Sequence, residues 1–311
     1  VAKCGGLSIY AATVAALWMT APRTPEWIGY AVAATLLVAW GVIDDVKGLS
    51  PPVKILGQVI AASIVASTGT SIESVPWSAL SVPLTIFWIV LVTNAVNLLD
   101  NMDGLSAGIT IITAAIFLVI TAAQAQIFSA MIFALLTGAI LGFLLHNFYP
   151  AKIFMGDAGS LFLGYLLAAL SLTSSYVVPT SVNLLPVLTP LLILSLPIFD
   201  TLSVMFIRRK EGRPLFIGDR RHFSHRLVEL GMSQRGAVIF IYLVAISIGV
   251  AAALLPYLPL WGQILVLLQT VALYIMITIL MHVAKRRHLE NGLNNVTNAE
   301  SKAEKVINRL K

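Results

Sequence analysis

The sequence has few charged residues and almost no cysteine. Only 11% of its 311 residues are charged, whereas a soluble domain carries roughly a quarter. The single cysteine, Cys4, excludes an intrachain disulfide and a thiolate cage for a metal ion. Because 58% of the residues are hydrophobic and the mean hydropathy is +0.91, the composition excludes a soluble enzyme fold and indicates an integral membrane protein.

Long stretches of the chain contain no Lys, Arg, Asp or Glu. Three of them lie between Asp103 and Lys152, between Asp157 and Asp200, and between Arg235 and Lys285. Each is long enough for two helices that cross a bilayer, joined by a short turn. Hydropathy therefore predicts an all-α, polytopic integral membrane protein with about ten transmembrane helices, at 7–22, 27–43, 53–68, 82–99, 105–123, 127–145, 161–178, 186–206, 237–255 and 261–283.

The basic residues predict how these helices are oriented. If successive helices alternate in direction, five segments share one side with the N-terminus, namely 44–52, 100–104, 146–160, 207–236 and 284–311. Every Lys and Arg except Arg23 lies in or next to this group. Since an excess of Lys and Arg marks the cytoplasmic side, we expect these segments in the cytoplasm. Residues 1–284 then form a single transmembrane domain, and 285–311 form a polar cytoplasmic tail.

Two adjacent acidic residues, Asp44 and Asp45, lie at the inner end of the second predicted helix. Two carboxylates beside hydrocarbon need a cation, which is either a divalent ion or a nearby lysine. Lys47 and Lys54 both follow closely in the sequence. The pair alone therefore does not distinguish a metal site from a helix end that Lys47 neutralises.

A second polar motif lies at the end of the fourth predicted helix. If that helix persists to its end, one face carries the polar residues that recur every three positions: Asn94, Asn97, Asp100 and Asp103. Hydrogen bonds between helices explain asparagines in a membrane span, but not two carboxylates one turn apart. The motif therefore favours a functional site.

A third motif, at 147–160, follows a long pair of apolar helices and begins with Asn147. Gly156 and Gly159 bracket Asp157, so the backbone can turn sharply before the next helix, which we expect to begin at Leu161. The segment lacks a Gly-Lys-Ser/Thr run, which argues against a nucleotide P-loop. An ordinary turn between helices remains the alternative.

The longest internal loop of the predicted topology is strongly basic, with Arg208, Arg209, Lys210, Arg213, Arg220, Arg221, His222, His225, Arg226 and Arg235. This density exceeds what membrane orientation needs, and arginine side chains fit phosphate oxygens well. His222 and His225 lie one helical turn apart, but no nearby Cys or intervening carboxylate supports a closed zinc site. We interpret one or both as contacts for phosphate or sugar, with solvated loop residues as the alternative.

The motifs together predict a site at the membrane surface with about five carboxylates and a basic loop. Carboxylates bind Mg²⁺, the ion bridges phosphate oxygens, and a basic loop neutralises the remaining charge. This combination indicates phosphoryl transfer to or from a membrane-embedded substrate. The net charge of +6 is explained by topology, and without an aromatic-basic module we expect no nucleic-acid partner.

Four stretches resemble, in the same order, the signature loops of the polyprenyl-phosphate N-acetylhexosamine-1-phosphate transferases, the glycosyltransferase 4 type. They are Asp-Asp-Val-Lys at 44–47 with Lys54, Asn-Ala-Val-Asn-Leu-Leu-Asp-Asn-Met-Asp-Gly-Leu at 94–105, Asn-Phe-Tyr-Pro-Ala-Lys-Ile-Phe-Met-Gly-Asp-Ala-Gly-Ser-Leu at 147–161, and His-Phe-Ser-His-Arg-Leu at 222–227. The resemblance implies an enzyme of the bacterial cytoplasmic (inner) membrane whose transmembrane domain is catalytic. It would move N-acetylhexosamine 1-phosphate from a UDP-sugar to undecaprenyl phosphate, release UMP and start a lipid-linked cell-envelope glycan.

The resemblance also implies roles for individual residues. Catalytic roles would fall to Asp44, Asp45, Asp100, Asp103, Asp157 and His222. Asp157 and Asp100 would ligate Mg²⁺, or Mn²⁺ in its place. One of Asp44 and Asp45 would act as a base beside the lipid phosphate, although a phosphate monoester is largely dianionic at neutral pH, so an electrostatic role is the alternative. Substrate binding would fall to Lys47, Lys54, Asn94, Asn97, Asn147, His225 and Arg226.

The sequence departs from the family pattern in two places. Family members generally have one more helix before the Gly-Gly stretch, here Gly5 and Gly6, so the resemblance implies eleven helices with the first one missing. The last basic loop lacks a run of three histidines, which favours the branch that starts teichoic acid, O-antigen or related glycans with an N-acetylglucosamine-type donor. The family fold is compatible with a homodimer, but no residue predicts one. The alternative function is a membrane transporter or channel with a cytoplasmic acidic site.

Overall fold

The protein is a bundle of helices joined by short turns. The computed structural model describes residues 2–20, 24–72, 78–178, 181, 183–212, 214 and 222–283. Within these residues, the β-structure consists of one isolated bridge between Ala2 and Ile153. The all-α prediction is therefore confirmed, whereas the predicted polar tail at 285–311 lies outside the described residues.

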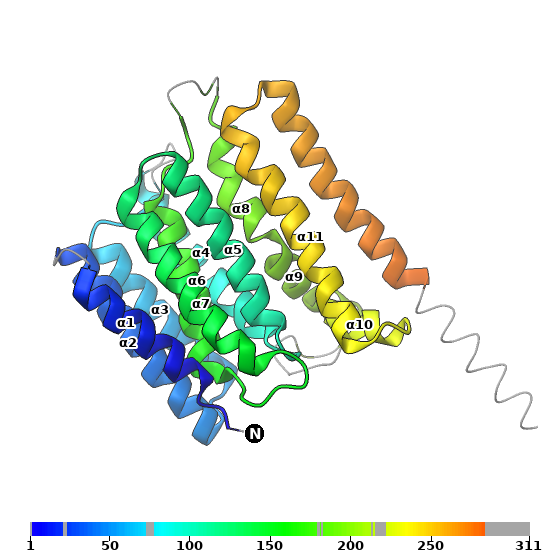
Figure 1. Cartoon of the computed structure of the whole chain (residues 1–311), viewed down its shortest axis with the longest axis horizontal. Helices are drawn as coiled ribbons and strands as arrows, with labels where there is room; N and C mark the ends of the chain where they lie inside the picture. The colour runs from blue at the N-terminus through cyan, green and yellow to red at the C-terminus, as the bar shows by residue number, and fades with distance from the viewer. Residues whose placement is uncertain are drawn as a thin grey trace, which may run out of the picture.

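Most helices run roughly antiparallel to their neighbours in the chain (Figure 1). The helices are α1 (Gly5–Thr20), α2 (Pro25–Lys47), α3 (Pro51–Ser67), α4 (Ser78–Leu99), α5 (Leu105–Ala123), α6 (Ile127–Asn147), α7 (Gly156–Thr173), η1 (Leu185–Leu188), α8 (Thr189–Ile193), α9 (Ser195–Lys210), α10 (Phe223–Glu229), α11 (Gln234–Leu254), η2 (Leu255–Tyr257) and a last helix, Leu260–Val283. Each of the ten predicted spans falls on one of these helical segments.

Among the described residues, seven helices are long and apolar enough to cross a membrane, or eight if the bent segment from Leu185 to Lys210 counts as one span. The apolar helices α1 and α3 are shorter, with 16 and 17 residues. The chain is therefore a multi-pass membrane protein, and the count of ten spans stays a prediction.

The predicted continuous span at 186–206 is broken. The segment Leu185–Ile193, which contains η1 and α8, and helix α9 meet at an angle of 68° on either side of Leu194. Pro197 explains the break, because it has no N–H to donate to the carbonyl of Ile193 and its ring crowds that carbonyl. Ile193 is the last residue of α8. The side chains of Asp200 and its neighbours are thereby carried on a separate helix, α9.

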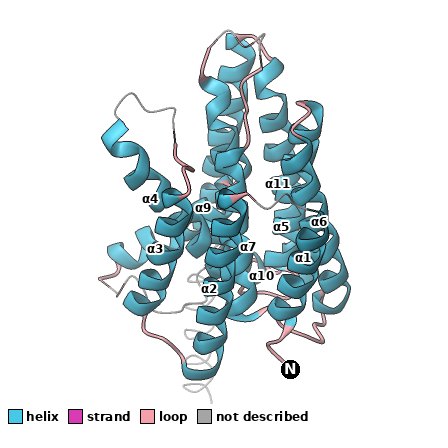
Figure 2. Cartoon of the chain, turned by 90° about the vertical axis from the view of Figure 1, so that its left-hand side faces the viewer, coloured by secondary structure: helices cyan, strands magenta, loops and turns pink. Residues whose placement is uncertain are grey.

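Helix α7 lies in the middle of the bundle, packed against α1, α2 and α4 (Figure 2). Nearly all of its side chains are buried. Two glycines allow its neighbours to approach closely. A Cβ on Gly6 would lie 2.2 Å from the backbone nitrogen of Gly159, and one on Gly41 would lie 2.4 Å from Cα of Ala158. Both contacts bring helix backbones together beside Asp157.

Segments that are distant in the sequence meet at one end of the bundle, near the N-terminus (Figure 1). The backbone nitrogen of Gly5 donates to the carbonyl of Phe154 at 3.0 Å, and Arg235 donates to the carbonyl of Tyr149 at 2.9 Å. The hydroxyl of Ser224 donates to Oδ1 of Asn101 at 2.6 Å. Asp45 also accepts a hydrogen bond from the backbone nitrogen of Ala158. Four of the five segments predicted to share one side therefore meet, the fifth, 284–311, lies outside the described residues, and the cytoplasmic orientation stays a prediction.

Candidate active site

A polar cavity opens at this end of the bundle. Its volume is about 380 Å³, and it is lined by Lys3, Asp45, Asn97, Asp100, Asn101, Met102, Asp103, Asn147, Phe154, Gly156 and Asp157. Four of these residues are acidic, and they come from the end of α2, the turn after α4 and the first turn of α7. The three acidic motifs of the sequence therefore meet around one space, as predicted.

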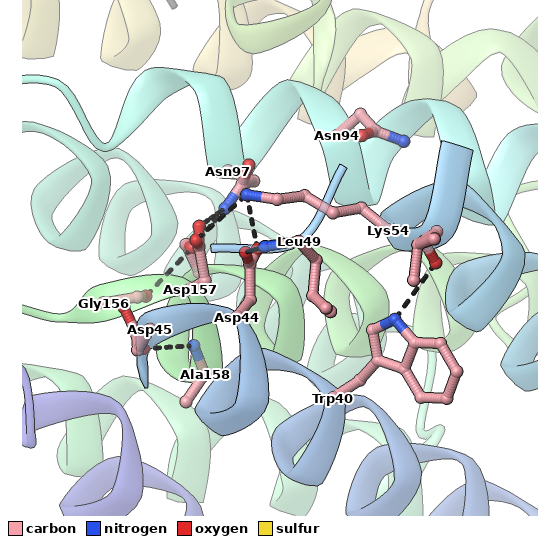
Figure 3. Close-up of polar contacts among 12 residues, drawn as sticks. Trp40, Asp44, Asp45, Leu49, Lys54, Asn94, Asn97, Gly156, Asp157 and Ala158 are labelled. Atoms are coloured by element: carbon pink, nitrogen blue, oxygen red, sulfur yellow. Dashed lines mark hydrogen bonds and ion pairs between the residues drawn. The ribbon is translucent and has the colours of Figure 1, made fainter. Parts of the chain in front are cut away.

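Asp157 lies at the centre of a set of polar contacts that joins three helices (Figure 3). Its Oδ1 accepts a hydrogen bond of 2.6 Å from Nδ2 of Asn97, and its Oδ2 lies 3.2 Å from Nζ of Lys54. Asn97 also donates to Oγ of Ser160 at 2.8 Å. The expected start of this helix at Leu161 is wrong, because α7 begins at Gly156 and Asp157 lies in its first turn. Gly156 makes the turn with φ of 71°.

Asp44 is neutralised by Lys54, whose ammonium group forms an ion pair with its Oδ2. Its Oδ1 accepts a 2.7 Å hydrogen bond from the backbone nitrogen of Leu49. Gly48 allows this contact, because its φ of 68° turns the chain back over the end of α2. The suggestion that Lys47 neutralises the pair is wrong, because the cation paired with Asp44 is Lys54, whereas Lys47 is exposed and forms no ion pair among the described residues.

Asp45 faces the cavity and the start of α7. Its Oδ2 accepts a hydrogen bond of 3.2 Å from the backbone nitrogen of Ala158. Its Oδ1 lies 3.6 Å from Nζ of Lys3, and this buried atom has no hydrogen-bond partner in the described part of the chain. The carboxylate therefore retains an oxygen that can accept a cation or a donor from a ligand.

Asp100 and Asp103 lie in the turn between α4 and α5. The stripe expected from a continuous helix is interrupted, because α4 ends at Leu99. Burial raises the pKa of Asp100 to about 7, and the negative charge of Asp157 is the second cause. Asp103 accepts a hydrogen bond of 2.9 Å from the backbone nitrogen of Ala151. The turn is thus tied to the loop that precedes α7.

The two remaining predicted asparagines, Asn147 and Asn94, make hydrogen bonds that link neighbouring segments of the protein. Asn147 lines the cavity but is buried; it accepts from the backbone nitrogen of Gly104 at 3.0 Å and donates to the carbonyl of Ile153 at 2.9 Å. Asn94 lies one turn deeper than Asn97, where its side-chain amide pairs with that of Gln58. The substrate-binding roles of both residues stay predictions.

The predicted basic residues of the last loop lie beside the cavity rather than in its wall. His222, His225 and Arg226 belong to α10 and the residue before it, and none of them lines the cavity. Arg226 donates to Oγ of Ser203 at 3.1 Å. Three other arginines of this cluster, Arg213, Arg220 and Arg221, lie outside the described residues.

The sequence reasoning missed two residues that line the cavity, and it gave no role to a third that lies outside it. Lys3 lines the cavity, and its only signal in the sequence was its position just before Gly5. Asn101 lines the cavity within a motif whose three-residue period passed over it. Asp200, left without a role, is bonded to His222 through Oδ2 and Nδ1 at 2.7 Å. These contacts depend on which helices are neighbours, which hydropathy does not reveal.

The cavity has the donor groups that a hard cation prefers. No three His, Cys, Asp or Glu side chains in the described ranges come close enough to hold a metal ion by themselves. Mg²⁺ commonly takes one or two carboxylates and completes its shell with water and substrate phosphates. Asp100 and Asp157 both face the cavity, and the carboxylate of Asp100 makes no hydrogen bond with the described residues. Together with Oδ1 of Asp45, which accepts no hydrogen bond from the described residues, these residues fit such a site.

Comparison with known proteins gives a consistent result. The sequence profile of Glycosyl transferase family 4 matches residues 27–175. The chain is 35% identical over 275 residues to the probable undecaprenyl-phosphate N-acetylglucosaminyl 1-phosphate transferase of Bacillus subtilis (strain 168), covering 85% of this chain and 76% of that protein. It is 33% identical to the decaprenyl-phosphate N-acetylglucosaminephosphotransferase of Mycobacterium leprae, with 78% of this chain and 70% of that protein covered. It is 28% identical to the undecaprenyl-phosphate alpha-N-acetylglucosaminyl 1-phosphate transferase of Yersinia pestis, with 87% of this chain and 78% of that protein covered.

Proposed function

The chain belongs to glycosyl transferase family 4, among the polyprenyl-phosphate N-acetylglucosamine-1-phosphate transferases, and we propose that it transfers N-acetylglucosamine 1-phosphate from a UDP-sugar to undecaprenyl phosphate. An oxygen of the lipid phosphate attacks the phosphorus that carries the sugar. The bond between that phosphorus and the bridging oxygen breaks, and UMP leaves. The observation that carries the proposal is the convergence of Asp45, Asp100 and Asp157 on one cavity.

The charges of the site suit two phosphorylated substrates. The lipid phosphate is largely dianionic at neutral pH, so no residue has to remove a proton before it attacks. Asp44 is engaged by Lys54 and by the backbone of Leu49, so its role is to fix the lysine rather than to act as a base. Lys3 lines the cavity, and Lys54 lies behind Asp157, which also lines it. Both lysines supply positive charge near the cavity and would favour bound phosphate.

The reaction would require Mg²⁺, for which Mn²⁺ could substitute, held by Asp100 and Asp157. When bound, the ion neutralises negative charge on the phosphates and polarises the phosphorus–oxygen bonds. Lys54 and Asn97 hold the carboxylate of Asp157 through separate oxygens. Asp103 holds the loop before α7 against the turn that carries Asp100.

The same proposal includes the location of the enzyme. The site lies at the cytoplasmic face of the inner membrane, where a UDP-sugar is available. The protein that forms it crosses the membrane ten times. The support is the concentration of Lys and Arg at the end of the bundle that holds the cavity. The product would be the first lipid-linked intermediate of a cell-envelope glycan.

The test measures UMP release and lipid labelling from radiolabelled UDP-N-acetylglucosamine. Purified protein is incubated with undecaprenyl phosphate, with and without Mg²⁺. Asp157→Asn should abolish labelling, whereas the matched change Glu26→Gln, at the opposite end of α2, should leave it unchanged. If folded, full-length protein turns over no UDP-hexosamine, the transferase proposal is wrong and transport becomes the better hypothesis.

A further inference from the structure

Asp200 and His222 form a buried pair outside the acidic cavity. Oδ2 of Asp200 lies 2.7 Å from Nδ1 of His222, and Oδ1 accepts a 2.7 Å hydrogen bond from the backbone nitrogen of Phe223. Asp200 is 2% exposed and His222 is 3% exposed. Both carboxylate oxygens are therefore used to fix the start of α10.

The pair determines which nitrogen of His222 carries a proton. An ionised carboxylate has acceptors only, so Nδ1 must donate to it. Nε2 then has no hydrogen in the neutral ring, and it makes no hydrogen bond with the described residues. A histidine whose second nitrogen is held in this way presents Nε2 in a defined orientation.

The start of α10 is also tied to the acidic cavity. Oγ of Ser224 donates to Oδ1 of Asn101 at 2.6 Å, and Asn101 lines the cavity. Phe223 packs in the same apolar cluster as Leu99 and Met102, which flank that turn. Asp200 on α9 and Asn101 in the turn after α4 thus hold consecutive residues at the start of α10.

We propose that Asp200 is a positioning residue of the transferase, which holds His222 as the Nδ1–H tautomer and leaves Nε2 to meet the phosphate or sugar of the donor. The contact of Nε2 with a donor rests on the proposed function. The tautomer and its dependence on Asp200 are properties of the protein without substrates.

The variant Asp200→Asn separates this role from simple packing, because it keeps the size of the side chain. If the amide oxygen continues to accept from Phe223, the amide NH₂ faces Nδ1 of His222. The opposite orientation places the NH₂ against the N–H of Phe223, where two donors would oppose each other. The ring should therefore move its proton to Nε2 and present a donor where the native protein presents an acceptor.

The first measurement is the nitrogen-15 spectrum of histidine-labelled full-length protein in liposomes at pH 8, without substrates. The difference from His222→Gln assigns the signals of His222. We expect a protonated Nδ1 and an unprotonated Nε2 in the native protein, and the reverse in Asp200→Asn. A native protein with protonated Nε2, or a variant with the native pattern, would overturn the inference.

The second measurement is steady-state kinetics with UDP-N-acetylglucosamine and undecaprenyl phosphate. Asp200→Asn should lower kcat/KM for the donor by at least about tenfold, as is typical of groups that orient a functional histidine. KM for the lipid should stay unchanged, because His222 is proposed to meet the donor. The matched control is Thr201→Val, since Thr201 is buried on the same helix and its hydroxyl has no hydrogen-bond partner among the described residues.

The outcomes distinguish the two proposals. Native protein that transfers no sugar phosphate contradicts the proposed function, while the spectra still decide the role of Asp200. Active native protein, together with donor kinetics in Asp200→Asn equal to those of Thr201→Val, contradicts the positioning role. If Asp200→Asn does not fold, the native spectrum alone decides whether Nδ1 carries the proton.

Discussion

Gln58 and Asn94 exchange two hydrogen bonds between their side-chain amides across the interface of α3 and α4. Gln58 lies one helical turn after Lys54, and Asn94 lies one turn before Asn97. The amide pair therefore sets the register of two helices whose next polar residues both contact Asp157. Buried amide pairs between membrane helices contribute to stability because their alternative partners are few.

This relationship predicts how variants of the pair behave. Gln58→Leu should lower stability in detergent by about 1 kcal/mol. In a double-mutant cycle with Asn94→Leu, the two effects should be strongly non-additive. Thermal unfolding measures the coupling, and donor KM separates the roles: if Asn94 binds substrate directly, Asn94→Leu raises KM and Gln58→Leu does not.

Lys54 neutralises two carboxylates, Asp44 and Asp157, so its removal should be costly. Lys54→Met leaves both acids without their cation, and breaking a largely buried ion pair destabilises by about 3 kcal/mol. Transferase activity should fall below detection. Activity and thermal stability of Lys152→Met, which changes an exposed lysine near the same cavity, should match those of the native protein.

A second substitution tests the electrostatic cause. Because Asp44 is the more buried partner, Lys54→Met combined with Asp44→Asn should recover part of the lost stability. Activity should not return, since the lysine proposed to favour bound phosphate is still absent. Equal stability of the single and double variants would show that the loss came from packing of the lysine chain instead.

Asp100 should make metal binding depend on pH near neutrality. Its raised pKa of about 7 means that the carboxylate is mostly protonated at pH 6 and mostly ionised at pH 8. Metal ligands bind as the deprotonated form, so Mg²⁺ affinity should rise about tenfold between these values. Calorimetric titration of Mg²⁺ without substrates measures this rise. In Asp100→Asn the affinity should be lower and the rise should disappear; an unchanged pH profile would exclude Asp100 as a ligand.

The positions of the helices were predictable from sequence because the membrane imposes a local rule. An apolar segment inside a bilayer must pair its own backbone N–H and C=O groups, which a helix does. Each of the ten apolar segments is accordingly helical. The bend was also signalled in the sequence by Pro197, but a hydropathy average over the whole segment does not detect a single proline. The early start of α7 was also missed, since polar Asp157 lowers the hydropathy of a turn that is nevertheless helical.

The acidic residues that line the cavity were largely predictable from the sequence, but the residues that form ion pairs and hydrogen bonds with acidic side chains were not. Buried carboxylates are costly in a membrane, so Asp45, Asp100 and Asp157 were prominent in the sequence. Which cation meets them depends on helix neighbours. Lys47 is nearer to Asp44 in the sequence, but the packing of α3 against α2 places Lys54 beside Asp44. The hydrogen bond between Asp200 and His222 likewise depends on how α9 packs.

The close contact between Gly41 and α7 should be essential for the geometry of the site. A Cβ at this position would lie 2.4 Å from Cα and 2.5 Å from the nitrogen of Ala158, both backbone atoms that cannot move independently. Gly41→Ala must therefore separate α2 from the first turn of α7. That shift would move Asp44 and Asp45 away from Asp157, although alanine itself favours a helix by about 1 kcal/mol.

We expect Gly41→Ala to lower transferase activity by at least about tenfold, because displacements of about 1 Å at a reacting centre have effects of that size or larger. Gly138→Ala is the matched control, since a Cβ there meets nothing within 4 Å and the same gain in helix propensity applies. Its activity should equal that of the native protein, and its thermal stability should be equal or higher. Equal activity and stability in both variants would mean that α2 and α7 are not in backbone contact beside Asp157.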